Sequence, residues 1–342
     1  MKYRPLGSSG IEASAVAFGA WAIGGWTWGG ADEQESIRAI HAFIDAGGNL
    51  IDTAPVYGFG RSEEVVGKAI ADRRDKVVLA TKCGLRWDLN EVQKTRAVKR
   101  FSTNDENIDW SGKPTEKSFD VLIYNGADGI REEVERSLKR LRTDVIDLYQ
   151  PHWQDDPTPI EERMRALEDL KKAGKIRAIG LSNPKPEQLA EYRKYGVIDA
   201  VQDRYSMLDR GQEQINLPTC VRDGLAFLAY SPLAQGLLTG KITPEREFGA
   251  GDQRRFKDRF KPENVRKVLD MLEPIRPVAE RHEAELAQVV IAWTLAQPGC
   301  SHVLCGARNP EQAVANARAG SLELANDDLE IINSAVATYR GV

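Results

Sequence analysis

The chain has 342 residues, of which 42% are apolar and 29% are charged, with 47 Lys and Arg against 51 Asp and Glu. This globular composition and the net charge of −4 exclude a disordered chain and give no support to a nucleic-acid-binding or membrane-surface protein. No run approaches the ~18 apolar residues of a membrane span, and the N-terminus lacks the apolar core of a signal peptide. The 4 cysteines are sparse and show no CxxC spacing, so we expect a reducing, cytoplasmic setting.

A strand-then-helix alternation runs along the whole chain. Short apolar runs typical of buried parallel strands occur at 15–18, 49–52, 77–82, 145–150, 176–182, 200–202, 225–231 and 302–306. Amphipathic stretches of helical period lie between them, at 33–46, from Ser62 onward, and at 130–141, 160–172, 186–195, 212–223, 264–281, 284–295 and 310–317. Strand–helix units in this number predict an α/β fold, a closed (β/α)8 TIM barrel that forms a single domain over residues 1–342.

A doubly wound, dinucleotide-binding sheet is the rival fold. It would require a G-x-G-x-x-G sequence between a strand and a helix, and the nearest approaches, Gly24-Gly25 and Gly58-Phe59-Gly60, lack the third glycine. A barrel of ~250 residues leaves about 90 residues over. We assign them to an N-terminal hairpin at 1–14, to insertions at 86–128 and 234–262, and to a C-terminal helix at 327–339.

Ionisable side chains stand where the predicted strands end, and barrels place their active sites at that end. Asp52 ends the second strand, with Tyr57 just beyond it; Lys82 ends the third, and His152 follows the fourth. A buried lysine needs a counter-ion, which Asp52 supplies, and a lysine aimed at a tyrosine would lower the pKa of its hydroxyl. The set can protonate a carbonyl oxygen, with His152 as a second donor, while a cofactor delivers hydride. We identify no metal site.

Several longer sequences around these residues carry a resemblance. They are Gly48-Asn49-Leu50-Ile51-Asp52-Thr53-Ala54-Pro55-Val56-Tyr57-Gly58, Ala80-Thr81-Lys82, Asp147-Leu148-Tyr149-Gln150-Pro151-His152, Gly180-Leu181-Ser182-Asn183 and Ala229-Tyr230-Ser231-Pro232-Leu233. With them the chain resembles the aldo-keto reductase superfamily over its full length, most closely the bacterial branch related to potassium-channel β-subunits. The resemblance implies reversible reduction of an aldehyde or ketone to the alcohol with NADPH, in which Tyr57 is the general acid, Asp52 and Lys82 tune its pKa, and His152 orients the substrate.

The resemblance also implies a set of cofactor-binding residues. Ser182, Asn183 and Gln202 would bind the nicotinamide carboxamide, and Tyr230 would stack on its ring. The pyrophosphate would meet Ser231, Leu233, Gly236 and Leu238, and the adenosine end would meet Gly306, Ala307, Arg308, Gln312 and Asn316. The animal branch has a lysine at the Gly306 position and an arginine at the Gln312 position. This chain lacks both cations, so Arg308 is the main cation left for a 2′-phosphate. The resemblance still favours NADPH, with NADH as an alternative.

Tryptophans gather in the predicted loops at the mouth of the barrel. Trp21, Trp87 and Trp153 are the candidates for the substrate wall, and flat aromatic walls suit sugar-like or aryl carbonyls. Trp110 lies in the first insertion, where it could line the mouth or anchor the loop. The second insertion contains a basic run at 254–261, which we interpret as a solvated loop or a cofactor clamp rather than a nucleic-acid site.

Two other functions remain open from the sequence. The first is a cofactor-binding, redox-sensing partner protein with little turnover. The second is an aldolase that forms a Schiff base on Lys82, which ranks last because Asp52 and Tyr57 suit an ion-paired lysine. A small-molecule carbonyl substrate is expected, with no nucleic-acid or membrane partner. The substrate's identity and the oligomeric state are not predicted.

Overall fold

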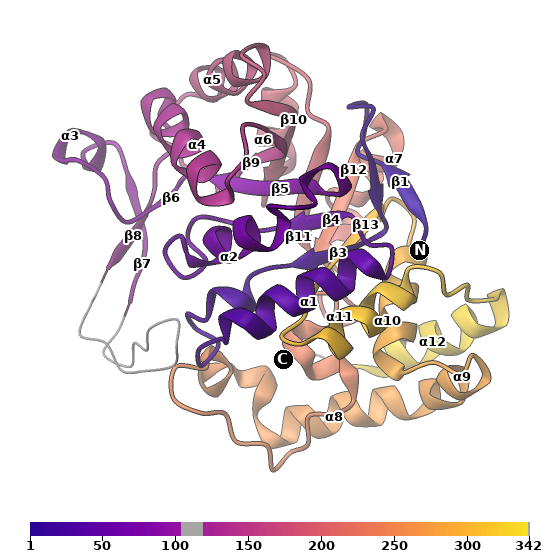
Figure 1. Cartoon of the computed structure of the whole chain (residues 1–342). Helices are drawn as coiled ribbons and strands as arrows, with labels where there is room; N and C mark the ends of the chain where they lie inside the picture. Colours follow the sequence, from indigo (N-terminus) through magenta and orange to yellow (C-terminus); the bar gives the residue numbers. More distant parts are fainter. Residues whose placement is uncertain (104–118, 341–342) are drawn as a thin grey trace.

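The structure, a computed structural model, describes residues 1–103 and 119–340. Parallel strands close into one barrel, in which each strand pairs with the next along the chain and the last pairs with the first. The barrel strands are β3 (Val16–Gly19), β4 (Leu50–Asp52), β5 (Val78–Cys83), β9 (Ile146–Pro151), β10 (Ile176–Ser182), β11 (Ala200–Arg204), β12 (Ala226–Tyr230) and β13 (His302–Gly306) (Figure 1). The predicted TIM barrel is confirmed. Ser231, which was assigned to the seventh strand, lies just beyond β12.

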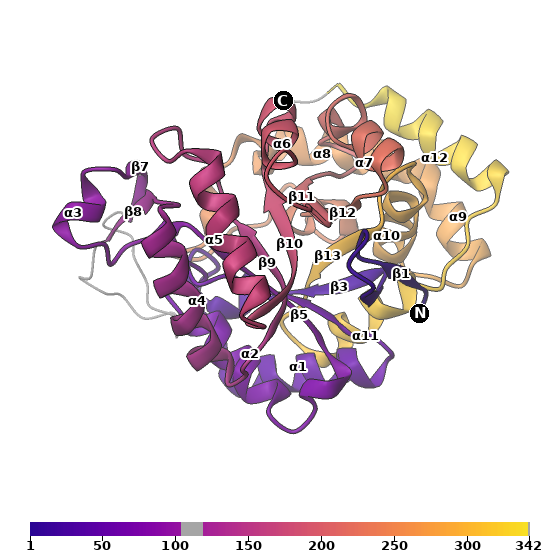
Figure 2. The same cartoon turned by 90° about the horizontal axis from the view of Figure 1, so that it is seen from above.

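Helices surround the strands, as Figure 2 shows from above. They are α1 (Glu33–Asp45), α2 (Arg61–Ile70), α4 (Ala127–Leu141), α5 (Ile160–Lys172), α6 (Pro186–Tyr192), α7 (Leu217–Asp223), α10 (Leu286–Ala296) and α11 (Pro310–Ala319). Local sequence sets their ends: the Asp32 side chain accepts a hydrogen bond from the Glu35 amide at 2.7 Å and so caps α1. The apolar face of α1, including Ile40 and Phe43, is buried in the core.

Two predicted helices are broken in the structure. The stretch 264–281 divides into α8 (Pro262–Leu272), a 3₁₀ turn η7 (Glu273–Ile275) and α9 (Arg276–Arg281). Pro274 and Pro277 lie at these breaks, and a proline has no amide hydrogen to continue the helical ladder. The stretch 212–223 likewise divides into η3 (Gly211–Gln214) and α7. The C-terminal helix is present as α12 (Asn326–Thr338).

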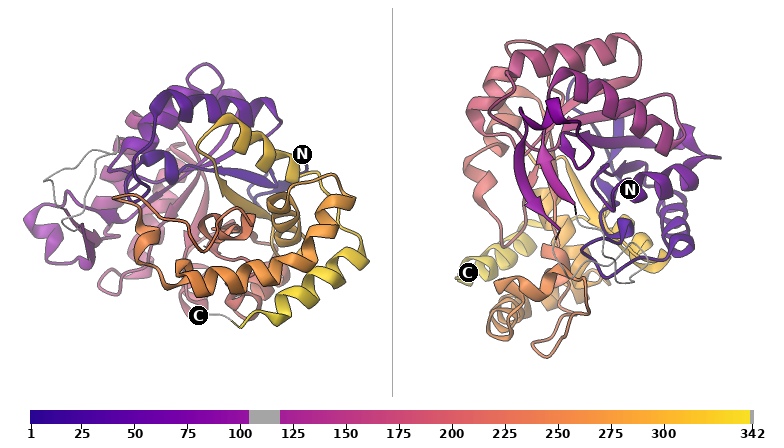
Figure 3. Two further views of the ribbon diagram at one scale, coloured as in Figure 1. Left: turned by 90° about the horizontal axis from the view of Figure 1, so that it is seen from below. Right: turned by 90° about the vertical axis from the view of Figure 1, so that its left-hand side faces the viewer.

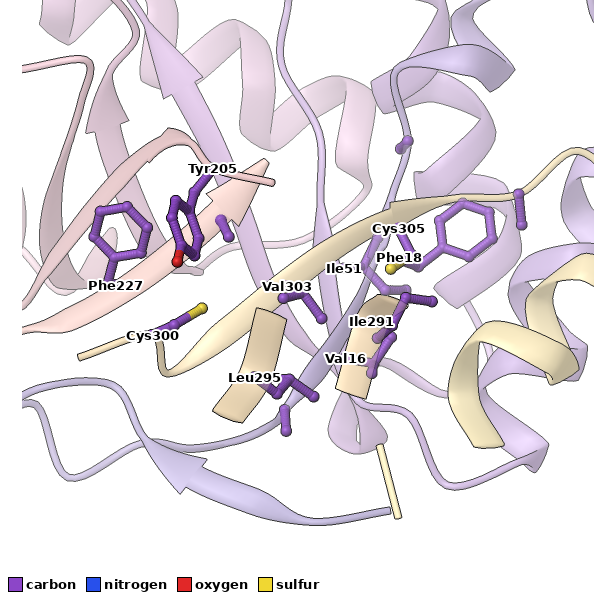
Figure 4. Close-up of a cluster of buried hydrophobic side chains, with 14 of the residues drawn as sticks. Val16, Phe18, Ile51, Tyr205, Phe227, Ile291, Leu295, Cys300, Val303 and Cys305 are labelled. Carbon is purple, nitrogen blue, oxygen red and sulfur yellow. The ribbon is translucent and has the colours of Figure 1, made fainter. Parts of the chain in front are cut away.

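The core has two layers. Side chains that point outward from the strands pack under the helices, as Figure 4 shows for Val303 and Cys305 of β13 beside Ile291 of α10. Inside the barrel, mostly small and aliphatic side chains form a second cluster. The N-terminal hairpin, β1 (Tyr3–Pro5) and β2 (Glu12–Ser14), contributes Leu6 and Ile11 to it. The hairpin therefore closes the amino-terminal end of the barrel, and the carboxyl ends of the strands are left for a site.

The two predicted insertions carry structure of their own. The first forms an antiparallel sheet of β6 (Leu85–Arg86), β8 (Asp120–Ile123) and β7 (Val98–Ser102), with a short helix α3 (Glu91–Lys94). It projects from one side of the barrel (Figure 3, left), near α4 as labelled in Figure 2. The second contains the 3₁₀ turns η4 (Ala234–Thr239), η5 (Gln253–Phe256) and η6 (Asp258–Phe260). Within the described residues, no helix combines the length and the apolar character that crossing a membrane requires.

Candidate active site

The four predicted catalytic residues come together at the carboxyl end of the barrel. Asp52 is the last residue of β4, Lys82 lies one residue before the end of β5, and His152 follows β9. Strands β4, β5 and β9 are neighbours in the barrel, so their ends bring these side chains to one place. Tyr57 enters from the loop after β4. The structure thus assembles residues that lie up to a hundred positions apart in the sequence.

Lys82 is the centre of this group. Its Nζ donates to Oδ2 of Asp52 at 2.7 Å and to the carbonyl oxygen of Thr53 at 2.9 Å, and it lies 3.4 Å from the Tyr57 hydroxyl. The other oxygen of Asp52 accepts from Nε2 of Gln202 at 2.9 Å. Lys82 and Asp52 are buried, so each is the charge partner that the other needs away from water. Burial lowers the pKa of Lys82, against the opposing pull of the Asp52 carboxylate.

Tyr57 and His152 face each other across the mouth. Their rings meet edge to face with centroids 5.7 Å apart. Burial and then the charge of Asp52 raise the pKa of Tyr57 well above its ordinary value, which is opposite to the lowering that the sequence predicted. The reason is that Asp52 already neutralises Lys82, while the phenol loses hydration. Burial, followed by the charges of Lys82 and Arg100, holds the pKa of His152 well below its ordinary value, so its ring is neutral.

The residues predicted to bind the nicotinamide form one hydrogen-bonded group beside these four. Asn183 has a positive φ of 53°, and its Nδ2 donates to the His152 carbonyl at 3.1 Å and to the Ser182 hydroxyl at 3.0 Å. Its Oδ1 accepts from the Tyr230 hydroxyl at 2.9 Å. Gln202 is held by Asp52, as described above. The structure therefore brings all four candidates together toward the carboxyl ends of β10, β11 and β12. Gln202 lies two residues before the end of β11, which continues past the predicted end of that strand.

The predicted pyrophosphate loop follows β12. Ser231 has a φ of 57° and Gly236 has a φ of 95°, so the chain turns through left-handed conformations here. Leu238 is fully buried, so only its backbone could meet a ligand, whereas Leu233 packs against the core and is partly exposed. The carbonyl of Gln235 accepts from Arg254 at 3.3 Å, and its Oε1 accepts from Nζ of Lys257 at 2.9 Å.

The predicted adenosine-binding residues lie at and beyond the end of β13. Nδ2 of Asn316 donates to the Gly306 carbonyl at 3.1 Å, and Oε1 of Gln312 accepts from the Arg308 amide at 3.0 Å. Ala307 is buried between them. These contacts fix the backbone that would carry the ligand. The Arg308 guanidinium donates to the Gly30 carbonyl at 2.6 Å, so this side chain also reaches the loop after β3.

The second insertion is joined to that loop across the mouth. Trp28 forms an antiparallel bridge with Asp252, and the Gln253 amide donates to the Thr27 carbonyl at 3.0 Å. Nε2 of Gln253 also donates to the Thr27 hydroxyl at 3.1 Å. We call these contacts of residues 27–28 with residues 252–253 the latch. Sequence reasoning flagged the basic run that follows, but it did not identify the latch, because the contact joins segments more than 220 residues apart.

Cations gather behind the latch. Arg254 pairs with Asp252 at 2.6 Å. The charges of Arg204, Arg259 and Arg254 act on Lys257, and the charge of Arg254 also acts on Arg308. Burial and then the neighbouring arginines lower the pKa of Lys257 to about 8. An excess of positive charge that depresses a lysine in this way is an environment that an anion would stabilise. The residues present therefore fit the phosphates of a dinucleotide cofactor.

The candidate substrate tryptophans differ in their placement. Trp21 packs near Tyr57 with centroids 6.0 Å apart, and Trp153 follows His152 and packs on the same small cluster as Tyr57. Trp87 packs on that same cluster and meets the Phe59 ring, with centroids 5.2 Å apart. Trp110 lies outside the described residues. Sequence reasoning missed Phe59 and Phe101, which complete this aromatic wall together with Trp26.

Comparison with known proteins identifies the family. The family model described as "Aldo/keto reductase family" matches residues 15–337. The NADH-specific methylglyoxal reductase of Escherichia coli is 40% identical over 340 residues, which cover 97% of each chain. The glycerol dehydrogenase structure from Gluconobacter oxydans has a TM-score of 0.83 and 37% identity, covering 98% of this chain and 94% of that one.

A more distant structure carries a bound cofactor. It is an aldo/keto reductase from Klebsiella pneumoniae in complex with NADP and acetate, with a TM-score of 0.72 and 26% identity, covering 99% of this chain and 97% of that one. The expected relation to potassium-channel β-subunits is not confirmed by these relatives. Because the family model spans nearly the whole chain and the relatives match over nearly their full length, the chain belongs to the aldo/keto reductase family and is an NAD(P)H-dependent oxidoreductase.

Proposed function

We propose that the protein reduces an aldehyde or ketone reversibly to the alcohol, with NADPH as the preferred cofactor and NADH as the alternative. The observation that carries this proposal is the chain from Asp52 through Lys82 to Tyr57, with steps of 2.7 and 3.4 Å. The cofactor, when bound, supplies hydride to the carbonyl carbon. Ser182, Asn183 and Gln202 would hold its nicotinamide, and the cationic group behind the latch would hold its phosphates.

Tyr57 is the proton donor in this proposal. Its raised pKa keeps the hydroxyl protonated at neutral pH, so the proton is present when negative charge develops on the substrate oxygen. As that proton leaves, the Lys82 ammonium at 3.4 Å stabilises the phenolate left behind. The neutral ring of His152 donates a second hydrogen bond to the same oxygen and orients it.

The test is an assay of hydride transfer to a panel of carbonyl compounds. The loss of NADPH or NADH absorbance measures the rate. Tyr57→Phe removes the donor hydroxyl and keeps the ring, so turnover should fall about 10²- to 10⁴-fold. Cofactor affinity, measured by quenching of tryptophan fluorescence, should not change. No hydride transfer in either direction by the wild-type protein, with tight cofactor binding intact, would overturn the proposal and favour the redox-sensing partner protein.

The preference for NADPH depends on Arg308 in this proposal. Arg308 uses one guanidinium nitrogen on Gly30, and a planar guanidinium can still present another edge to a 2′-phosphate. The 40% identical relative is named as NADH-specific, so the preference needs a direct measurement. Arg308→Ala should weaken NADPH about tenfold and NADH much less; equal weakening of the two cofactors would show that Arg308 only braces the loop after β3.

A further inference from the structure

Arg100 occupies an irregular position in the first insertion. In the pairing of β7 with β8, Lys99 is opposite Leu122 and Phe101 is opposite Val121, so Arg100 is the extra residue of a β-bulge. A bulge frees one residue from the ladder and redirects its side chain, and bulges are frequent beside active sites. Phe101, the next residue, stacks on Trp26 within the aromatic wall. The bulge therefore presents Arg100 at the substrate side of the barrel mouth.

The Arg100 side chain lies on an aromatic face of the candidate site. Its guanidinium carbon is 4.1 Å from the centroid of the Trp153 ring, which is stacking contact. Trp153 follows His152, the proposed substrate-orienting donor. Stacking occupies the face of a guanidinium but leaves its N–H edges for hydrogen bonds. Arg100 is exposed, so those edges are open to a ligand in solution.

Arg100 also differs from its neighbours in its charge balance. Lys99 pairs with Asp120 at 3.0 Å and Arg96 pairs with Glu162 at 3.0 Å. Among residues 1–103 and 119–340, no carboxylate is within ion-pair distance of Arg100. The Asp52 carboxylate is already bound to Lys82, and the His152 ring carries no charge because burial, Lys82 and Arg100 lower its pKa. Within the described part of the chain, Arg100 therefore gives the substrate side of the mouth a positive charge that no carboxylate pairs.

We propose that Arg100 is a specificity residue that selects carbonyl substrates bearing a carboxylate or a phosphate. The reacting carbonyl lies between Tyr57 and His152, and the anionic end of the same molecule binds the Arg100 guanidinium over Trp153. This inference rests on the proposed reductase function. The anion is held away from the reacting atoms, so Arg100 strengthens binding of substrate and transition state alike and acts on KM more than on kcat.

The experiment compares matched substrates that differ in charge. One pair is 4-formylbenzoate and its neutral methyl ester, and the other is glyceraldehyde 3-phosphate and glyceraldehyde. The wild-type protein should show a KM about tenfold lower for the anionic member of at least one pair, the size of effect that one charge-assisted, bidentate contact gives. The pair that shows the difference identifies the anionic group as carboxylate or phosphate.

Variants then assign the preference to Arg100. Arg100→Gln should raise the KM for the anionic substrate to that of its neutral partner, with kcat within about twofold. Lys99→Gln is the matched control, because it removes the same charge from the same strand at a residue already paired with Asp120, and the preference should remain. Tryptophan quenching by the cofactor should be unchanged in both variants, which shows that they fold.

Two results would overturn the proposal. One is equal KM values for both members of both pairs in the wild-type protein. The other is a preference for anions that Arg100→Gln leaves intact. Both results require turnover of the neutral aldehydes, so they are distinct from failure of the proposed function, in which neither member of either pair would be reduced with either cofactor.

Discussion

His152 is neutral near physiological pH because burial and two cationic neighbours, Lys82 and Arg100, oppose its protonation. It can then donate one hydrogen bond to a substrate oxygen without adding charge to a site that already holds the Lys82 ammonium. The consequence is that its proton count does not change around pH 6.5, where an ordinary histidine titrates. This property comes from the tertiary environment, and the sequence predicted only that His152 would be a donor.

We therefore predict that His152 contributes no inflection near pH 6.5 to the pH profile of kcat/KM. The measurement is the reduction rate of one aldehyde between pH 5.5 and 9 at low substrate and saturating cofactor. His152→Gln keeps a donor of similar reach and should lower the rate about tenfold while leaving the shape of the profile unchanged. An inflection near 6.5 in the wild-type profile that disappears in His152→Gln would contradict the neutral ring.

Asp203, next to Gln202 in β11, carries a carboxyl group whose burial raises its pKa to about 7, although Nδ2 of Asn216 donates to it at 2.8 Å. The unfolded chain has the ordinary value near ~4. A raised pKa in the folded state means that this group's stabilising contribution is complete below the unfolded value and is lost as the pH rises through about 7. Asp203 therefore destabilises the fold at about pH 7 and above.

Asp203→Asn should raise the free energy of unfolding by up to about 4 kcal/mol at pH 8 and by little at pH 4. Denaturant unfolding at the two pH values measures the difference. Asp209→Asn is the matched control, and the expected change in its unfolding free energy has the opposite sign. The pKa of Asp209 is lowered, and the Arg259 guanidinium at 2.9 Å contributes to that lowering. Asp209→Asn should destabilise the protein at pH 8. A lower stability of Asp203→Asn at pH 8 would show that the buried carboxyl is ionised in the fold without penalty.

At the scale of elements, the latch joins the second insertion to the loop after β3. Only a few hydrogen bonds hold it, including the two from Gln253 to Thr27, and neither segment is part of the barrel. Elements with so few contacts open at low energetic cost, which suits a segment that must let a cofactor in and out. The pairing joins distant loops, so no periodicity or local turn signal in the sequence could have predicted it.

Gln253→Ala removes the side-chain bonds to Thr27 and to Lys257 and leaves the backbone bond in place. Cofactor dissociation, followed by stopped-flow tryptophan fluorescence, should become about three- to tenfold faster for NADPH and NADH alike. Lys241→Ala is a control in the same insertion, because Lys241 pairs with Glu285 on the exposed surface. Faster dissociation of NADPH alone, with that of NADH unchanged, would instead place Gln253 at the 2′-phosphate.

For the molecule as a whole, the sequence predicted those site residues whose positions follow from the order of the barrel strands. Asp52, Lys82 and His152 were found because parallel barrel strands bring their carboxyl ends together, so three separate strand ends predict one site. Arg100 was not found, because the bulge that redirects it depends on the register of β7 against β8. The direction of the Tyr57 pKa shift was also missed, since it depends on how deeply the loop buries the ring.

The opposite end of the barrel offers a test of how separate stability and catalysis are. Leu6 of the N-terminal hairpin is fully buried in the cluster inside the barrel, with Leu50 of β4 and Leu148 of β9. Leu6 contacts the strands at the end of the barrel opposite the mouth. Because the barrel interior is closely packed with aliphatic side chains, it would relax little around the void that a smaller residue leaves. Leu6→Ala should therefore cost about 2–5 kcal/mol of unfolding free energy.

The same change should leave cofactor affinity and kcat within about twofold, because barrel enzymes separate the residues of the closed end from those of the catalytic end. Val92→Ala is the control for removing apolar carbon, since Val92 is 75% exposed and its loss should cost about 0.5 kcal/mol or less. If Leu6→Ala lowered kcat as strongly as it lowered stability, the hairpin would be coupled to the mouth through the strands, and the two ends of the barrel would have to be treated as one cooperative unit.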